Sequence, residues 1–247
     1  MVLAALLTLS VRLIGESGRN LTTVFLSFSF ALWLFTDLYW LIYDLMRPET
    51  RMPFAANEIG ESAMFLMNAA IVNSAVRHRI RPPFGVLFGT LIFSVANVIL
   101  WILWSGETVQ DLFIGTVFAW SLYSIVRSLW WSNALNKREW ILLSLLCAAI
   151  ILCQALTFIL PENIKNIPDL SAYVLLIAGI LFFVCILIKA FRGNLPYTQL
   201  FLSFALVTWI TLAKYMSGGN WYNLFLTLET FGMPLWYLLT KKVVKAE

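Results

Sequence analysis

Long apolar runs dominate the chain, and they recur at intervals that suit membrane-crossing helices. A helix of about 20 residues crosses a hydrocarbon core that is roughly 30 Å thick. Short polar breaks, most of them containing Gly, Pro or Asn, separate the runs. We expect spans at approximately 21–46, 56–78, 84–105, 108–132, 138–160, 170–191, 196–217 and 221–241.

The breaks carry residues that end helices. Arg47-Pro48, Arg81-Pro82-Pro83 and Gly218-Gly219-Asn220 are examples, because proline lacks a backbone donor and glycine tolerates the left-handed conformation that follows many helices. The connections are short, which favours antiparallel packing of consecutive helices. The predicted fold is therefore all-α, a polytopic transmembrane helix bundle of about eight spans that forms a single membrane-embedded domain over residues 1–247.

The first fourteen residues form a shorter apolar segment. As a helix, Met1 to Ile14 would be only about 21 Å long, and it carries Arg12. We expect it to be an interfacial helix or a short ninth span. A cleaved signal sequence is less favoured, because Leu13-Ile14-Gly15-Glu16-Ser17 is a poor cleavage site.

Composition supports a membrane protein and narrows its chemistry. Hydrophobic residues make up 61% of the chain and charged residues 12%, whereas soluble domains contain about 45–50% apolar and about 25% charged residues. The single histidine, His78, lies in a charged segment, and the three cysteines lie inside apolar runs. Neither type follows a metal-binding, haem-binding or disulfide pattern, so we expect no metal and no cofactor.

Charge alternates sharply between successive connections. One side of the predicted bundle receives twelve of the 17 Lys and Arg residues but only three of the 13 Asp and Glu residues. The positive-inside rule makes this side cytoplasmic, together with the C-terminus. We therefore expect a multi-pass protein of the cell membrane whose partners are the bilayer and a cytoplasmic or membrane protein at the basic inner face. Nucleic acid is not expected, because the basic residues are dispersed over separate loops.

Tryptophan follows the predicted helix ends. Most of these residues lie where interfacial aromatic belts are expected, and those beside acidic groups could instead form walls of a cation site. The residues concerned are Trp101, Trp104, Trp130, Trp131, Trp140, Trp221 and Trp236.

Polar groups inside the spans are the main functional signal, because a charged side chain in a bilayer costs at least a few kcal/mol. Asp37, Trp40 and Asp44 share one helical stripe in the first long span. The second span carries several acidic and amide residues near its start, and Asn97, Lys214 and Glu229 occur in later spans. Nearly all of them fall in the predicted outer half. The candidate ligand-binding residues are Asp37, Trp40, Asp44, Glu58, Glu61, Asn68, Asn97, Lys214 and Glu229.

Two interpretations of these groups stay open. They could reach headgroup water or serve as interhelical hydrogen-bonding glue. Alternatively, Asp37, Glu58, Glu61 and Glu229, partly neutralised by Lys214, could line an outward-facing acidic pocket for a cation or an amine-bearing ligand. Glu229 is expected to be the deepest carboxylate of the set.

One stretch resembles a known kind of membrane module. Ala31-Leu32-Trp33-Leu34-Phe35-Thr36-Asp37-Leu38-Tyr39-Trp40-Leu41-Ile42-Tyr43-Asp44, followed by Met52-Pro53-Phe54-Ala55-Ala56-Asn57-Glu58, is similar to the multi-helix sensory modules that precede bacterial histidine kinases and diguanylate cyclases. The resemblance covers about thirty residues. It implies that Asp37, Trp40, Tyr43 and the turn from Pro53 to Glu58 are sensor-core positions.

Three functions follow from the sequence, in order of preference. The first is a sensor-like or regulatory membrane subunit with an outward-facing polar pocket, and the second is a small transporter or channel for a cation or amine-bearing solute. The third is an intramembrane enzyme, which is disfavoured because no Ser-His, Cys-His, HExxH or GxSxG pattern accompanies the acidic residues. No catalytic residue is predicted.

Overall fold

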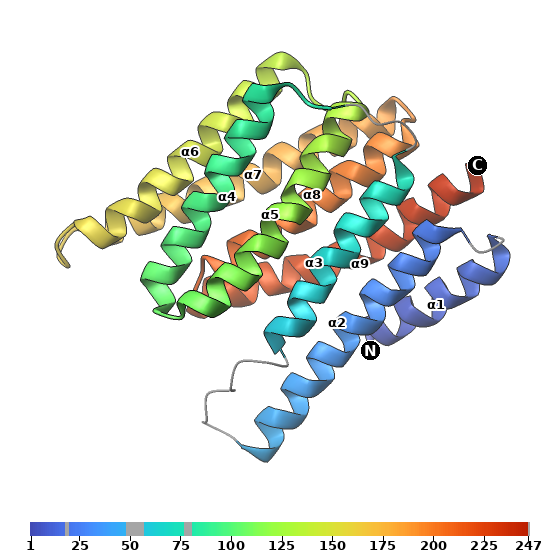
Figure 1. Cartoon of the computed structure of the whole chain (residues 1–247), viewed down its shortest axis with the longest axis horizontal. Coiled ribbons are helices and arrows are strands. Elements are labelled where there is room, and N and C mark those ends of the chain that lie inside the picture. The colour runs from blue at the N-terminus through green and yellow to red at the C-terminus, as the bar shows by residue number, and fades with distance from the viewer. Residues whose placement is uncertain (18–19, 48–56, 77–80, 247) are drawn as a thin grey trace.

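The computed structural model describes residues 1–17, 20–47, 57–76 and 81–246, and gives only the backbone of residues 44, 57–59, 61 and 246. The part of the chain that it describes is helical, with helices joined by short connections (Figure 1). The helices are α1 (Val2–Glu16), α2 (Leu21–Met46), α3 (Asn57–Ala75), α4 (Phe84–Ser105), α5 (Thr108–Trp131), α6 (Lys137–Ile159), α7 (Asn166–Arg192), α8 (Pro196–Tyr215) and α9 (Gly219–Ala246).

Helix boundaries follow local signals in the sequence. Asn20 caps α2 by accepting a hydrogen bond from the Thr22 N–H at 2.9 Å. At the start of α6, Asn136 and Glu139 form a reciprocal capping box, which satisfies two backbone donors that a helix start otherwise leaves unpaired. Gly106 ends α4 in the left-handed conformation, at φ 76°, which glycine adopts without steric cost.

Helix α8 occupies the centre of the bundle. It packs against α7 and α9, its neighbours in sequence, and also against α3 and α5. Every residue from Thr198 to Lys214 is buried. A helix that is buried on all sides has no lipid-facing stripe, and this explains why Ser, Thr and Gln are spread around its whole circumference.

Close packing around α8 depends on small residues in its neighbours. Gly179 in α7 faces the indole of Trp209, and a Cβ at this position would come within 2.2 Å of the ring. The same indole donates a hydrogen bond to the Leu176 carbonyl at 2.9 Å. Small residues of this kind let helix backbones approach closely inside a membrane.

Helices α1 and α6 lie at the edges of the bundle. Helix α1 contacts α2 and α9, and Leu3, Leu6 and Leu13 provide its buried face. In α6 only Ile150 is fully buried. Most of the surface of α6 is therefore available to a hydrophobic solvent such as lipid.

Six of the helices in the described part of the chain are long and apolar enough to cross a membrane, judged by length and composition: α2, α4, α5, α6, α7 and α8. Helix α1 is shorter, with 15 residues. The apolar part of α3 that can be assessed is Ser62–Ala75, and α9 carries Asn, Thr, Glu and Lys side chains along its length. Six apolar spans are compatible with a multi-pass membrane protein.

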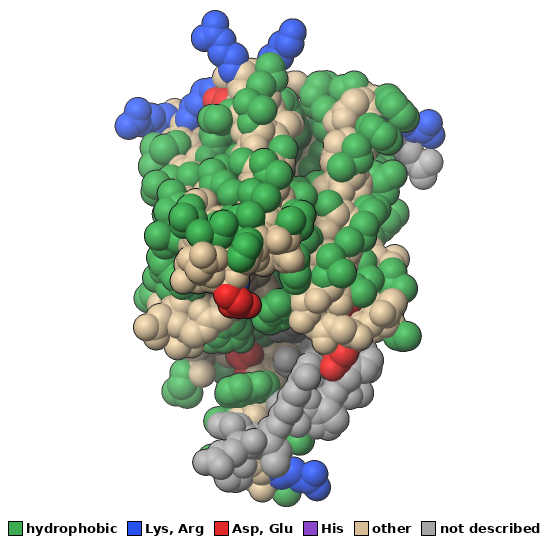
Figure 2. All heavy atoms as spheres, turned by 90° about the vertical axis from the view of Figure 1, so that its left-hand side faces the viewer, with side chains coloured by type: hydrophobic (Ala, Val, Ile, Leu, Met, Phe, Trp, Pro, Cys, Tyr) green, Lys and Arg blue, Asp and Glu red, His purple; other side chains and the backbone are tan. Residues whose placement is uncertain are grey.

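The two ends of the bundle differ in charge. We call the end that holds residues 81–83, 132–136 and 193–195 and the C-terminal part of α9 the basic end, and the opposite end the acidic end. In Figure 2 the Lys and Arg side chains project mainly from the upper end, with a further basic side chain at the lowest part of the view, while hydrophobic side chains cover the sides and Asp and Glu side chains lie mainly in the lower half. This polarity matches the alternation of charge between connections that the sequence predicts.

Candidate functional site

The most deeply placed charges in the described chain form an ion pair between the last two helices. The Lys214 amine donates to Glu229 Oε2 at 3.0 Å, and the two side chains are 5% and 0% exposed. The Thr211 hydroxyl donates to the other carboxylate oxygen, Oε1, at 2.6 Å. Glu229 thus has a partner on each oxygen, as a buried carboxylate requires.

The direction of helical side chains explains how the pair meets. Lys214 is next to last in α8, and side chains of a helix lean toward its N-terminus. Its long stem therefore reaches back into the bundle, toward the level of Thr211. Glu229 lies ten residues into α9, roughly 15 Å along the helix, and meets the amine there. Both residues were predicted to lie in the same half of the bundle, and the structure places them in direct contact.

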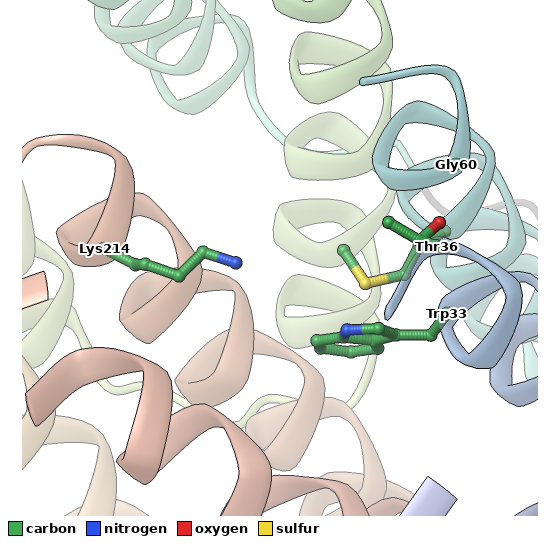
Figure 3. Close-up of a pocket in the computed structure, with 5 residues that line it drawn as sticks. Trp33, Thr36, Gly60 and Lys214 are labelled. Carbon is green, nitrogen blue, oxygen red and sulfur yellow. The ribbon is translucent and has the colours of Figure 1, made fainter. Parts of the chain in front are cut away.

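A small, narrow depression lies beside the pair. It is lined by Trp33 and Thr36 of α2, Gly60 and Met64 of α3, and Lys214 of α8. Figure 3 shows the Lys214 side chain directed across the gap toward Trp33 and Thr36. Among the residues that the structure describes, this depression is too narrow to admit a water molecule. Lys214 is the one residue of the predicted acidic pocket among the five that line this depression.

An aromatic layer lies between this depression and the basic end. Trp33 packs against Trp236 with ring centroids 6.2 Å apart, and Trp236 stacks on Phe204 at 4.5 Å. The Trp236 indole also donates to the Ser203 carbonyl. Trp236 is completely buried, so its assignment to an interfacial belt was wrong. Its indole N–H is satisfied by a neighbouring helix rather than by headgroup water.

Asp37 and Trp40 lie further along α2, and both side chains are exposed. Asp37 nevertheless lies within electrostatic range of Lys214 and Glu229. It follows Thr36, which lines the depression. The structure therefore brings Asp37 to the rim of the ion-pair region and leaves Trp40 outside it.

The two amides of the predicted set are buried away from the ion pair. Asn68 of α3 accepts a hydrogen bond from the Ser29 hydroxyl of α2 at 3.3 Å. Asn97 of α4 donates to the Phe93 carbonyl at 2.8 Å, and its side-chain oxygen finds no partner among the described residues. Asn68 thus fits the alternative role of interhelical glue.

The remaining predictions fall where the structure gives no side chain. The side chains of Asp44, Glu58 and Glu61 lie outside the described part of the structure, as does the segment from Pro53 to Ala56.

Sequence reasoning missed the uncharged members of the site. Thr211, Trp33, Thr36, Gly60 and Met64 complete it, yet each is an ordinary residue of an apolar helix. Only Thr211 carried a usable signal, because it precedes Lys214 by three residues and so shares its helix face.

No group of three or more His, Cys, Asp or Glu side chains that could hold a metal ion occurs within the residues that the structure describes. Comparison of the chain with protein-family models, with curated proteins and with solved structures found no match.

Proposed function

We propose that this chain is a sensor-like or regulatory subunit of the cell membrane, with eight spans and a cytoplasmic C-terminus. The observation that carries this proposal is the buried Lys214–Glu229 pair, with Asp37 in electrostatic range. Removing one ion of such a pair leaves the other buried without a partner, which costs several kcal/mol of stability. Replacing that ion by another of the same charge costs less. A cation or an amine-bearing ligand that reached Glu229 from the outer side would displace Lys214 and change how α8 packs on α9.

Helix α9 offers a direct route from the pair to the other side of the membrane. From Glu229 to Lys245 it runs sixteen residues, roughly 24 Å. At the basic end Lys242 donates to Gln199 of α8 and to Asn194, and Lys245 lies 3.8 Å from Glu16. A change in the packing of α8 on α9 would therefore alter a basic surface that a cytoplasmic or membrane partner could contact.

The similarity of residues 31–58 to bacterial sensory modules also supports this role, because Asp37 belongs to that stretch. The transporter or channel remains the alternative. It is less favoured because the layer formed by Trp33, Trp236 and Phe204 fills the space between the pair and the basic end. Flux of cations or amines through proteoliposomes above that of protein-free vesicles would decide for the alternative.

The test uses purified protein carrying a fluorophore at Lys245→Cys, in a background where Cys147, Cys153 and Cys185 are replaced by serine. Methylammonium, ethanolamine and simple metal cations serve as ligands. We expect a saturable change in fluorescence that is lost in Asp37→Asn and in the double variant Lys214→Met/Glu229→Met. The control Glu162→Gln removes an equal charge at the acidic end and should respond normally. A response that persists in the double variant would refute the proposal.

Partner binding and orientation are tested separately. A reporter fused to the C-terminus should be cytoplasmic, as the charge distribution predicts. The basic end should capture a reproducible companion on purification from mild detergent, and charge reversal at Lys241 and Lys242 should release it. An extracytoplasmic reporter would overturn the orientation.

A further inference from the structure

A second hollow lies at the acidic end, where the ends of α4, α6, α7 and α8 diverge. Its volume is about 290 Å³, enough for a small organic molecule, whereas the depression beside Lys214 is closed. Five aromatic side chains from four helices contribute to its walls: Trp101, Trp104, Phe158, Tyr173 and Tyr215. Asp169 of α7 supplies a carboxylate.

The aromatic walls are held in place by neighbouring rings. Tyr173 stacks on Trp221 of α9 with centroids 5.0 Å apart. Trp101 packs against Phe118 at 5.4 Å and against Tyr215 at 6.1 Å. Rings fixed in this way lose little conformational entropy when a ligand binds, so the cavity is largely preorganised.

The carboxylate is available to a ligand. Asp169 is half-buried, and no ion pair joins it to another residue in the described ranges. Lys165, four residues earlier, pairs with Glu162 instead. A negative charge beside aromatic faces favours a cation, because the ring faces are themselves electronegative.

Three of the residues that line the cavity carry a buried hydrogen-bond donor without a partner in the described part of the chain. These donors are Trp101 Nε1, Gln154 Nε2 and Tyr215 Oη. Such groups are costly to bury unpaired. A ligand oxygen that reached one of them after a small side-chain adjustment would satisfy it.

These features select one ligand class. A metal cation would need several oxygen ligands, and one carboxylate among rings does not supply them. A simple anion would meet the charge of Asp169. We propose that this cavity binds an organic ammonium ion that also carries an oxygen acceptor, a choline-type amino alcohol, either free or as a lipid headgroup. The ammonium would lie against the rings and Asp169, and the oxygen would accept from the unpaired donors.

The cavity adjoins the ion pair without sharing its acids. The Lys214 amine lies 5.4 Å from the centroid of the Tyr215 ring, and Tyr215 lines the cavity. Binding here does not depend on the proposed sensor role, and it is tested with different residues.

Choline is the probe, measured by calorimetry and tryptophan fluorescence on full-length protein in a maltoside detergent, which contains no choline. We expect saturable binding that Asp169→Asn weakens by about tenfold or more. Trp104→Leu, at a side chain that is 70% exposed, should weaken it without threatening the fold. Glu107→Gln is the matched control, since it removes a carboxylate at the same end of the bundle that does not line the cavity, and it should bind choline as the wild type does.

Neutral 3,3-dimethylbutan-1-ol, which has the shape of choline without its charge, should bind at least about tenfold more weakly than choline. A short-chain phosphatidylcholine that displaces choline would identify a lipid headgroup as a ligand source, whereas choline binding without such displacement would favour the free cation. The proposal is overturned if choline does not bind saturably, if the neutral analogue binds equally well, or if neither Asp169→Asn nor Trp104→Leu weakens binding.

Discussion

The Lys214–Glu229 pair makes a quantitative prediction about stability. At 3.0 Å and almost complete burial, the attraction is of order 5 kcal/mol for an effective dielectric constant of about 20. The cost of desolvating each ion is also several kcal/mol. The pair therefore contributes about as much to the free energy of unfolding as apolar residues of similar size would. A single buried ion without its partner would instead be strongly destabilising.

We expect Lys214→Met and Glu229→Met each to lower the free energy of unfolding by about 3–5 kcal/mol. The double variant should recover most of this loss and be within about 1 kcal/mol of the wild type, or more stable. Equilibrium unfolding in mixed micelles, followed by circular dichroism, measures all four proteins. The double-mutant cycle then gives the coupling free energy directly.

The control cycle uses Lys165→Met and Glu162→Met, a surface ion pair at the same end of the bundle. Its coupling should stay within about 1 kcal/mol, because water screens exposed pairs. The reasoning is refuted if the buried cycle gives an equally small coupling, or if the double variant is as unstable as the sum of its single variants.

Three further predictions concern packing and capping. Gly179→Ala should lower the free energy of unfolding by about 1–3 kcal/mol because its Cβ meets the Trp209 indole, and the same unfolding assay measures it. Gly89→Ala, where a Cβ has open space, should be neutral or stabilise by up to about 1 kcal/mol; a loss equal to that of Gly179→Ala would contradict the steric explanation. Asn136→Ala should cost about 1 kcal/mol by removing the capping box with Glu139, and Asn136→Ser should restore most of it if capping is the cause.

Much of the architecture could be predicted because helix ends are local. The break at Gly218-Gly219 separates α8 from α9 as expected, and α6 begins within one residue of the predicted boundary. These signals depend on backbone freedom and capping, which a short stretch of sequence contains. Membrane-spanning capacity is less local, since α9 is amphipathic and mixed in composition along its length.

The details of the site depend on the register between helices, which the sequence does not contain. The sequence pattern predicted that Lys214 and Glu229 lie in the same half of the bundle, but their contact requires a particular offset between α8 and α9. Trp236 illustrates the same limit. Its position near a predicted helix end indicated an interface, whereas the packing of α2 and α8 around it makes it core. Asp169 was not singled out, because its importance depends on rings from helices distant in sequence.

The complete enclosure of α8 has a consequence for biosynthesis. Ser, Thr, Gln and Lys side chains point from every side of this helix into protein, so hydrocarbon would solvate it poorly before its neighbours are in place. Inserting α8 alone would leave Lys214 in lipid without Glu229. The helix is therefore expected to leave the insertion machinery together with α7 and α9, as a three-helix unit. Glu229 follows in the chain fifteen residues after the lysine that it neutralises.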